Sequence, residues 1–149
     1  MKIIFICTGN TCRSPMAKVI AEAVFSNMPI SFASAGVAAT SFSPASELAL
    51  AAAKENGLDL SDHVSKAVTE GDLAESDLAL TMTESHKLYL LGAYPKYEKK
   101  IFTICEYSTG LRQDVADPFG GGNREYDSCF KQLRKLMNKL KKKLKGGVK

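Results

Sequence analysis

The most constraining feature of the sequence is a short apolar run that leads directly into a loop of small and polar residues. Residues 3–6 are Ile, Ile, Phe and Ile, and a run of this length with branched side chains is typical of a buried strand. Cys7 follows at the end of this strand, and five residues separate it from Arg13. A helical pattern then opens, which predicts Ser14 as its cap and Pro15 in its first turn. This order of strand, tight loop and helix N-terminus limits the folds open to the chain.

A loop of this kind favours a bound anion such as phosphate. The backbone N–H groups of residues 8–13 would collect at the positive end of the helix. Gly9 and Asn10 are the residue types that most readily adopt the left-handed conformation that such a loop needs. The same N–H groups, together with Arg13, would stabilise a thiolate, which predicts a lowered pKa and a nucleophilic role for Cys7. Arg13 can also bind two phosphate oxygens in a bidentate fork.

The rest of the chain alternates between strand and helix patterns, which favours an α/β fold. We expect a small four-stranded parallel sheet with helices on both faces, and the Cys-x5-Arg loop after its first strand. The other expected strands are 30–35, 77–82 and 100–105. The expected helices are 15–27, 44–56, 83–92 and 123–145, with a capped turn at Thr69-x-x-Asp72 and a long connection over 106–122. Ligands bind such sheets at the carboxyl ends of the strands, so the loop after the first strand and the connection after the last one can meet.

Length and composition predict one soluble domain over residues 1–149. The chain has four cysteines and no recognisable signal peptide, so we expect reduced thiols and a cytoplasmic location. No stretch approaches a membrane span, and no Cys/His cluster has metal-ligand spacing. Residues 131–149 carry nine Lys or Arg and no acid, whereas residues 1–130 carry 11 basic and 16 acidic residues. We interpret the Lys-rich end as a solvated helix terminus and do not expect nucleic-acid binding, because no aromatic is interleaved with the lysines.

The segment Cys-Thr-Gly-Asn-Thr-Cys-Arg-Ser-Pro-Met-Ala at positions 7–17 resembles the low-molecular-weight protein tyrosine phosphatase family. A second mark of that family, Asp-Pro-Phe-Gly-Gly, lies at positions 117–121, and the resemblance covers almost the whole chain. The resemblance implies a metal-independent protein phosphatase without a cofactor, which acts on phosphorylated proteins through a phosphocysteine intermediate and is expected to be a monomer.

The family chemistry transfers to this chain residue by residue. Cys7 would attack phosphorus, and Arg13 with the N–H groups of residues 8–13 would stabilise the equatorial oxygens. Asp117 would protonate the leaving group and then accept a proton from the hydrolytic water. The resemblance also implies a set of supporting residues. These phosphate-binding and loop-support residues are Thr8, Gly9, Asn10, Thr11, Cys12, Ser14, Ser34 and His63.

Within that set, the resemblance gives particular roles to three side chains. Asn10 would hold the left-handed turn by bonding to Ser14, Ser34 and His63, and Ser14 would also donate to the Cys7 sulfur. Cys12 would form a reversible disulfide with Cys7 that protects the nucleophile from irreversible oxidation. A role for Cys12 as a plain structural filler is equally open.

The choice of substrate depends on a few pocket residues. Many family members have Ile or Leu in the middle of the loop, where this chain has Thr11. The bacterial protein arginine phosphatases of the family have Thr there and Asp-Pro-Phe-Gly-Gly as the acid segment. A guanidinium is polar and planar, so an aliphatic wall would crowd it and leave its N–H groups unpaired. We therefore favour phosphoarginine over phosphotyrosine, with Thr11, Phe42 and Phe119 as the selectivity residues.

Two other functions stay open on the sequence alone. Arsenate reductases share the Cys-x5-Arg loop, but they need further cysteines near residues 80–90, and this chain has none there. A non-catalytic phosphate-binding module would keep Arg13 and lose Cys7 or Asp117. We assign His86 no role, and we interpret Cys105 and Cys129 as plain core or surface thiols.

Overall fold

The computed structural model describes residues 1–40 and 42–146, so position 41 and the last three residues of the Lys-rich end lie outside this part. The strands are β1 (Lys2–Cys7), β2 (Ser31–Gly36), β3 (Leu78–Thr81) and β4 (Ile101–Thr103). The helices are α1 (Arg13–Val24), α2 (Glu47–Glu55), α3 (Glu70–Glu75), α4 (Glu84–Ala93), α5 (Ile104–Thr109) and α6 (Asn123–Gly146), with a 3₁₀ helix η1 at Pro95–Lys100.

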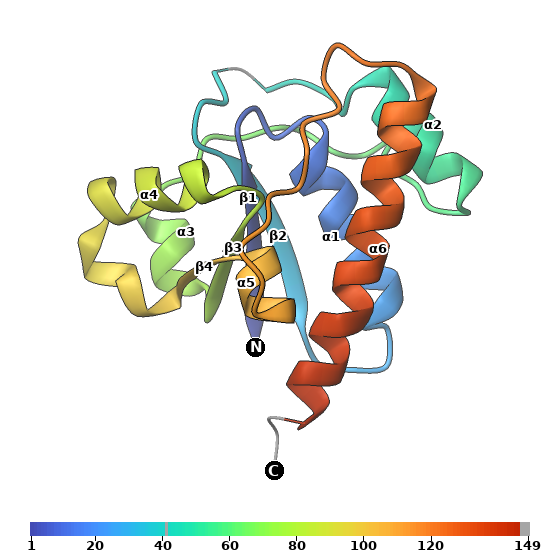
Figure 1. The fold of residues 1–149 in the computed structure, drawn as a ribbon. Coiled ribbons are helices and arrows are strands. Elements are labelled where there is room, and N and C mark those ends of the chain that lie inside the picture. The colour runs from blue at the N-terminus through green and yellow to red at the C-terminus, as the bar shows by residue number, and fades with distance from the viewer. Residues whose placement is uncertain (41, 147–149) are drawn as a thin grey trace.

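All four strands are parallel and lie in the order β2-β1-β3-β4, with helices on both faces (Figure 1). Alternate residues of β1 pack on opposite faces of the sheet, in two separate apolar clusters. Ile3 and Phe5 pack in the larger apolar cluster with residues of α1, α2, α5 and α6. Ile4 and Ile6 pack in the smaller cluster, to which α3 contributes Leu73 and α4 contributes Leu90. The expected α/β class and the four-stranded parallel sheet are therefore confirmed.

The strand order creates a switch point between β1 and β3. The helix that follows β1 is α1, and it packs on one face of the sheet, whereas α4, which follows β3, packs on the other. Loops that leave neighbouring strands toward opposite faces open a crevice at the carboxyl edge of a parallel sheet. Cys7 ends β1 at this edge, so the fold places the cysteine loop at the switch point (Figure 1).

The boundaries near β4 differ from the prediction. The apolar run 100–105 predicted one strand, but β4 ends at Thr103 and a helix begins at Ile104. The Thr103 side chain accepts from the Glu106 backbone N–H, and the Glu106 side chain accepts from the Thr103 backbone N–H, so a capping box starts α5 here. The long connection predicted over 106–122 therefore loses its first residues to a helix. The capped turn predicted at Thr69-x-x-Asp72 is present as α3.

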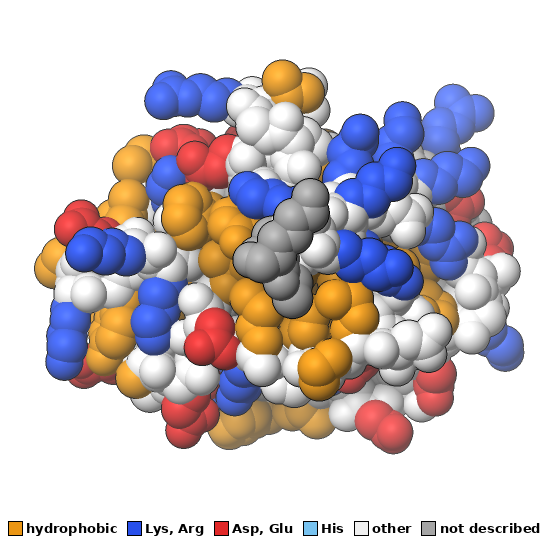
Figure 2. All heavy atoms as spheres, turned by 90° about the horizontal axis from the view of Figure 1, so that it is seen from below, with side chains coloured by type: hydrophobic (Ala, Val, Ile, Leu, Met, Phe, Trp, Pro, Cys, Tyr) orange, Lys and Arg blue, Asp and Glu red, His pale blue; other side chains and the backbone are white. Residues whose placement is uncertain are grey.

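The end of α6 lies at the end of the molecule opposite the cysteine loop (Figure 1). Figure 2 shows this end, with Lys and Arg side chains gathered on one side of it. Two lysines of α6 attach the helix to neighbouring segments: Lys141 donates to the Val24 carbonyl at 2.9 Å, and Lys143 donates to the Tyr107 carbonyl at 2.7 Å. None of the helices in the described part combines the length and apolar character needed to cross a membrane.

Candidate active site

The loop between β1 and α1 turns at Asn10, whose φ of 59° lies in the left-handed region. Of the two residues whose types suit this conformation, Asn10 adopts it and Gly9 does not. The helix also begins two residues earlier than predicted, at Arg13 instead of residue 15, and its N-cap position is Cys12, which makes no side-chain capping hydrogen bond. Ser14 is therefore not the cap. Its buried hydroxyl lies inside the first turn and points to the loop.

Asn10 is fully buried and joins the loop to three other segments. Its Nδ2 donates to Ser14 Oγ at 2.8 Å and to Ser34 Oγ at 3.0 Å, and its Oδ1 accepts from the Lys66 backbone N–H at 3.0 Å. The Asn10 backbone carbonyl lies 2.7 Å from His63 Nε2. The geometry agrees with the implied support network, except that His63 contacts the backbone of Asn10 rather than its side chain.

The Cys7 sulfur is buried and surrounded by hydrogen-bond partners. Ser14 Oγ lies 2.8 Å from it, and the Asn10 backbone N–H donates to it over 3.3 Å. Burial nevertheless raises the pKa of Cys7 above its ordinary value, and the hydrogen bonds from Ser14 and Asn10 and the charge of Arg13 only oppose this effect. The predicted lowering of the Cys7 pKa is therefore wrong, because burial of the sulfur outweighs the hydrogen-bond donors and the charge of Arg13.

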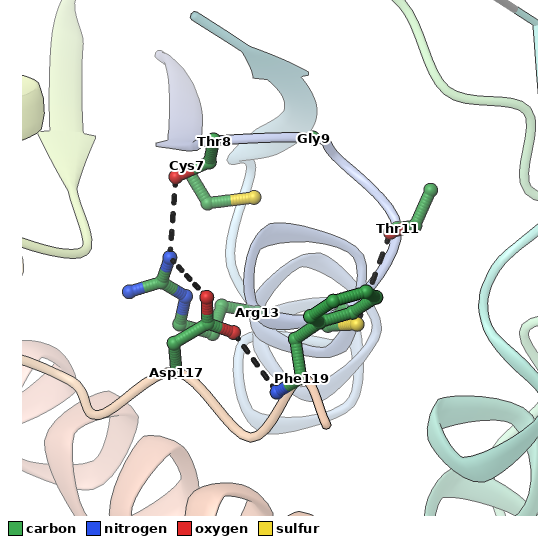
Figure 3. A pocket seen from close by; sticks show the side chains of 8 residues that line it. Cys7, Thr8, Gly9, Thr11, Arg13, Asp117 and Phe119 are labelled. Carbon is green, nitrogen blue, oxygen red and sulfur yellow. Dashed lines mark hydrogen bonds and ion pairs between the residues drawn. The ribbon is translucent and has the colours of Figure 1, made fainter. Parts of the chain in front are cut away.

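Arg13 folds back beneath the loop, as its position predicts, and is almost completely buried. Its Nη1 donates to the Val115 carbonyl at 3.0 Å, and its Nη2 donates to Thr8 Oγ1 at 3.4 Å. The same Nη2 lies 3.6 Å from Asp117 Oδ2 (Figure 3). The backbone N–H of Val115 also bonds to the Met82 carbonyl just past β3, so the segment that carries Asp117 is fixed to the sheet edge.

These side chains line a pocket of about 240 Å³. Figure 3 shows the Cys7 sulfur on one side of this pocket, with Asp117 and Phe119 on a separate segment of the chain. The lining residues are Cys7, Thr8, Gly9, Thr11, Cys12, Arg13, Asp117 and Phe119. The Cys7 sulfur, the buried Arg13 guanidinium and the half-exposed Asp117 carboxylate thus face one pocket, whose volume suits a phosphate-sized anion and part of the group attached to it.

Two of the three proposed selectivity residues line this pocket. Thr11 and Phe119 both do so, and the Phe119 ring is 78% exposed at its mouth. Phe42 is 84% exposed and does not line the pocket, so its proposed role lacks geometric support. The Thr11 backbone carbonyl accepts from the Ser46 N–H at 2.9 Å, which ties the middle of the loop to the N-terminus of α2.

Cys12 is a buried free thiol, as is Cys7. Its sulfur lies 3.2 Å from the hydroxyl oxygen of Tyr126 and 3.4 Å from Ser46 Oγ. The disulfide between Cys7 and Cys12 stays a prediction. Cys105 and Cys129 are buried, and burial raises the pKa of Cys129 to about 12, which agrees with plain core thiols.

Sequence reasoning missed three residues that hold the site. His86, to which we assigned no role, is buried with Nε2 2.8 Å from Thr8 Oγ1. Tyr126 contacts Cys12, and Val115 supplies a carbonyl to Arg13. All three residues are distant from the loop in sequence, so no local pattern could have indicated their contacts. The Val115 contact is also made by a backbone carbonyl, which does not depend on the type of residue.

Comparison with known proteins agrees with this geometry. The family model described as low molecular weight phosphotyrosine protein phosphatase matches residues 2–149. The protein-arginine-phosphatase of Bacillus subtilis is 40% identical over 147 residues, covering 97% of each chain. The low molecular weight protein-tyrosine-phosphatase PtpB of Staphylococcus haemolyticus is also 40% identical, over 95% of this chain and 98% of its own.

Solved structures give the same result at the level of the fold. A mutant of the YwlE arginine phosphatase with a phosphorylated active site serine superposes with a TM-score of 0.94 and 39% identity, over 97% of this chain and 96% of that one. A low molecular weight protein tyrosine phosphatase from T. tengcongensis superposes with a TM-score of 0.92 and 44% identity, over 96% and 99%. The chain therefore belongs to the low molecular weight phosphotyrosine protein phosphatase family, and it is a cysteine-dependent phosphatase.

Proposed function

We propose that this phosphatase hydrolyses phosphoarginine in proteins, with Cys7 as nucleophile and Asp117 as proton donor. The observation that carries the choice of substrate is Thr11 in the wall of the pocket, where its hydroxyl replaces an aliphatic side chain. Relatives named protein-arginine-phosphatase, at 40% and 36% identity over nearly the full length, support the same choice.

The first half of the reaction forms the phosphocysteine. The buried Cys7 thiol must lose its proton, and an arriving phosphoryl dianion is a base that can accept it. The sulfur then attacks phosphorus, the P–N bond breaks, and the released guanidino nitrogen takes a proton from Asp117. Arg13 and the loop N–H groups stabilise the equatorial oxygens as charge moves across them.

The second half returns the enzyme to its starting state. Asp117, now a carboxylate, accepts a proton from a water molecule that attacks the phosphocysteine. The P–S bond breaks, and the Ser14 hydroxyl, 2.8 Å from the sulfur, stabilises the thiolate that is released. The thiolate then regains, from the departing inorganic phosphate, the proton that it gave to the phosphoryl group at the start.

A protein tyrosine phosphatase activity is the second candidate. The PtpB relative supports it, because its identity to this chain equals that of the arginine phosphatase of Bacillus subtilis. Both substrates would use the same loop backbone and Arg13, because these groups contact only the phosphoryl group. The pocket walls therefore decide between them.

Substitution of the wall residue tests the choice directly. Thr11→Ile should lower the ratio of kcat/KM for a phosphoarginine peptide over a phosphotyrosine peptide by about tenfold or more, because a guanidinium loses space and a polar neighbour. Thr11→Ser, which keeps the hydroxyl, is the matched control and should keep the ratio. A wild type that prefers phosphotyrosine, or an unchanged ratio in Thr11→Ile, would contradict the arginine assignment.

The nucleophile has its own test. Cys7→Ser should abolish turnover of both peptides and still bind inorganic phosphate, because the loop and Arg13 remain. Cys129→Ser serves as the control, since that thiol lies outside the pocket and is expected to leave turnover intact. Substantial turnover by Cys7→Ser would exclude the phosphocysteine route.

A further inference from the structure

His86 lies in the first turn of α4 and reaches across the switch point to the cysteine loop. Its backbone N–H donates to the hydroxyl of the N-terminal cap Thr83 at 3.1 Å, which fixes the residue at the helix start. The ring is 5% exposed, and its Nε2 lies 2.8 Å from Thr8 Oγ1. The Thr8 hydroxyl is thus contacted from two helices on opposite faces of the sheet, by His86 of α4 and by Arg13 of α1.

The Thr8 hydroxyl has one proton and two lone pairs. Arg13 Nη2, at 3.4 Å, uses one lone pair. His86 Nε2 can therefore either donate to the second lone pair or accept the only proton. In the first arrangement the hydroxyl proton remains available to the pocket that Thr8 lines, and in the second it does not.

The other ring nitrogen decides between these arrangements. His86 Nδ1 is buried and has no hydrogen-bond partner within the described residues. If the proton were on Nδ1, a buried N–H donor would be unpaired, whereas with the proton on Nε2 only an acceptor lone pair is unpaired. Unpaired buried N–H groups are the rarer and costlier case.

The ring has only one proton to place at neutral pH. Burial, together with the charge of Arg13, lowers the pKa of His86 to about 4. Asp114 and Asp117 act in the opposite direction without restoring the ordinary value. The neutral ring donates from a single nitrogen, so its tautomer determines what the Thr8 hydroxyl can do.

We propose that His86 is a positioning residue that donates from Nε2 to Thr8 Oγ1, so that the Thr8 hydroxyl donates its proton to a phosphoryl oxygen in the pocket. Thr8 then adds a side-chain donor to the backbone donors of the loop. Thr8 Oγ1 also accepts from Arg13 Nη2, so the guanidinium is held where it faces the phosphoryl group. The inference rests on the proposed role of the Cys7 loop in phosphoryl transfer.

Kinetics on para-nitrophenyl phosphate test the proposal, since this substrate does not depend on the choice of amino acid. Thr8→Val should lower kcat/KM about tenfold or more, because a hydrogen bond to a charged oxygen is lost. His86→Leu should lower it roughly three- to tenfold, because the hydroxyl is free to turn away. The double variant should lose no more than Thr8→Val alone, since His86 acts only through Thr8.

Conservative variants separate positioning from folding. His86→Gln retains a side-chain N–H donor and should restore most of the activity lost in His86→Leu. Leu90→Val removes one methylene from a buried side chain of the same helix, in the smaller apolar cluster and outside the pocket, and should lower stability without lowering kcat/KM. An equal kinetic loss in Leu90→Val and His86→Leu would overturn the proposal.

Nitrogen NMR gives a readout that is independent of turnover. The ¹⁵N shifts of His86 at pH 7 should report the Nε2–H tautomer, and the Nδ1–H tautomer would overturn the proposal. Losses that multiply in the double variant would also overturn it. A wild type without turnover of any phosphate ester would instead refute the proposed function, whereas an active wild type with an unaffected His86→Leu variant would refute only the role of His86.

Discussion

The two carboxylate oxygens of Asp117 have different surroundings, and this difference aims the acid. Oδ1 accepts from the Phe119 backbone N–H at 3.0 Å, within the same short turn. Oδ2 faces the pocket, 3.6 Å from Arg13 Nη2. Pro118 restricts the backbone between Asp117 and Phe119, because its ring limits φ. One oxygen is therefore held by the turn, and the other faces the pocket, where the proposed proton transfer to a leaving group requires it.

Asp117→Asn tests the acid role with little change of shape, because the Asn carbonyl can still accept from the Phe119 N–H. The rate for a poor leaving group, such as a phosphoarginine peptide or phenyl phosphate, should fall by about 10²–10⁴-fold. The loss should be much smaller for dinitrophenyl phosphate, whose leaving group hardly needs a proton. Asp127→Asn, the same change on α6, should leave both rates unaffected, and equal losses on both substrates in Asp117→Asn would contradict proton transfer.

At the scale of single residues, the sequence predicted the reactive groups better than their environment. Cys7, Arg13 and Asp117 are brought into one pocket as expected. The raised pKa of Cys7 was not predicted, because it depends on how tightly the folded chain excludes water from the sulfur. The contact of His86 with Thr8 spans 78 positions and depends on the strand order, which no local pattern encodes.

At the scale of elements, the end of β2 lies directly beneath the loop that ends β1. Cys7 pairs with Gly36 across the two strands. A Cβ on Gly36 would come within 2.4 Å of the Thr8 carbonyl oxygen and 3.0 Å of the Asn10 backbone nitrogen. Gly36 is therefore required by close backbone approach, which the pattern of the strand expected over 30–35 does not indicate.

Gly36→Ala should displace the loop, because the added methyl has no space against backbone atoms. We expect a loss of about 1–3 kcal/mol in the free energy of unfolding, together with lower kcat/KM. Gly92→Ala is the matched control, since a Cβ at that helical position meets nothing within 4 Å, and it should stabilise the protein by about 0.5–1 kcal/mol. Urea titration and kinetics on both variants check this, and unchanged kinetics in Gly36→Ala would contradict the close-packed loop.

The sequence predicted an element correctly where its apolar periodicity extends over many turns. The prediction failed where a capping interaction determines the boundary between a strand and a helix. The last helix shows its apolar positions over many turns, and α6 was predicted at 123–145 and found at Asn123–Gly146. The start of α5 depends on one reciprocal pair, Thr103 and Glu106, inside a run that is apolar enough for a strand. The capping pair is present in the sequence, but it lies within an apolar run that is equally typical of a strand.

At the scale of the whole molecule, the folded state holds several titratable groups in their neutral forms. Burial lowers the pKa of His63, and it lowers that of His86 from 6.5 to about 4. Burial also raises the pKa of the thiols of Cys7, Cys105 and Cys129 above 9.0. Unfolding releases all of these groups to water, where their ordinary pKa values return.

The sign of each shift predicts a stability maximum between about pH 6.5 and 9. As pH falls from 6.5 toward 4, the unfolded chain binds protons that the folded His86 does not, so the free energy of unfolding falls. As pH rises above 9.0, the unfolded chain loses thiol protons that the folded chain keeps, so the free energy of unfolding falls again. Urea unfolding midpoints, measured across this range with a reductant present, check both limbs. In His86→Gln the acid limb should become shallower while the alkaline limb stays the same, and an acid limb that is flat in the wild type would contradict a neutral, buried His86.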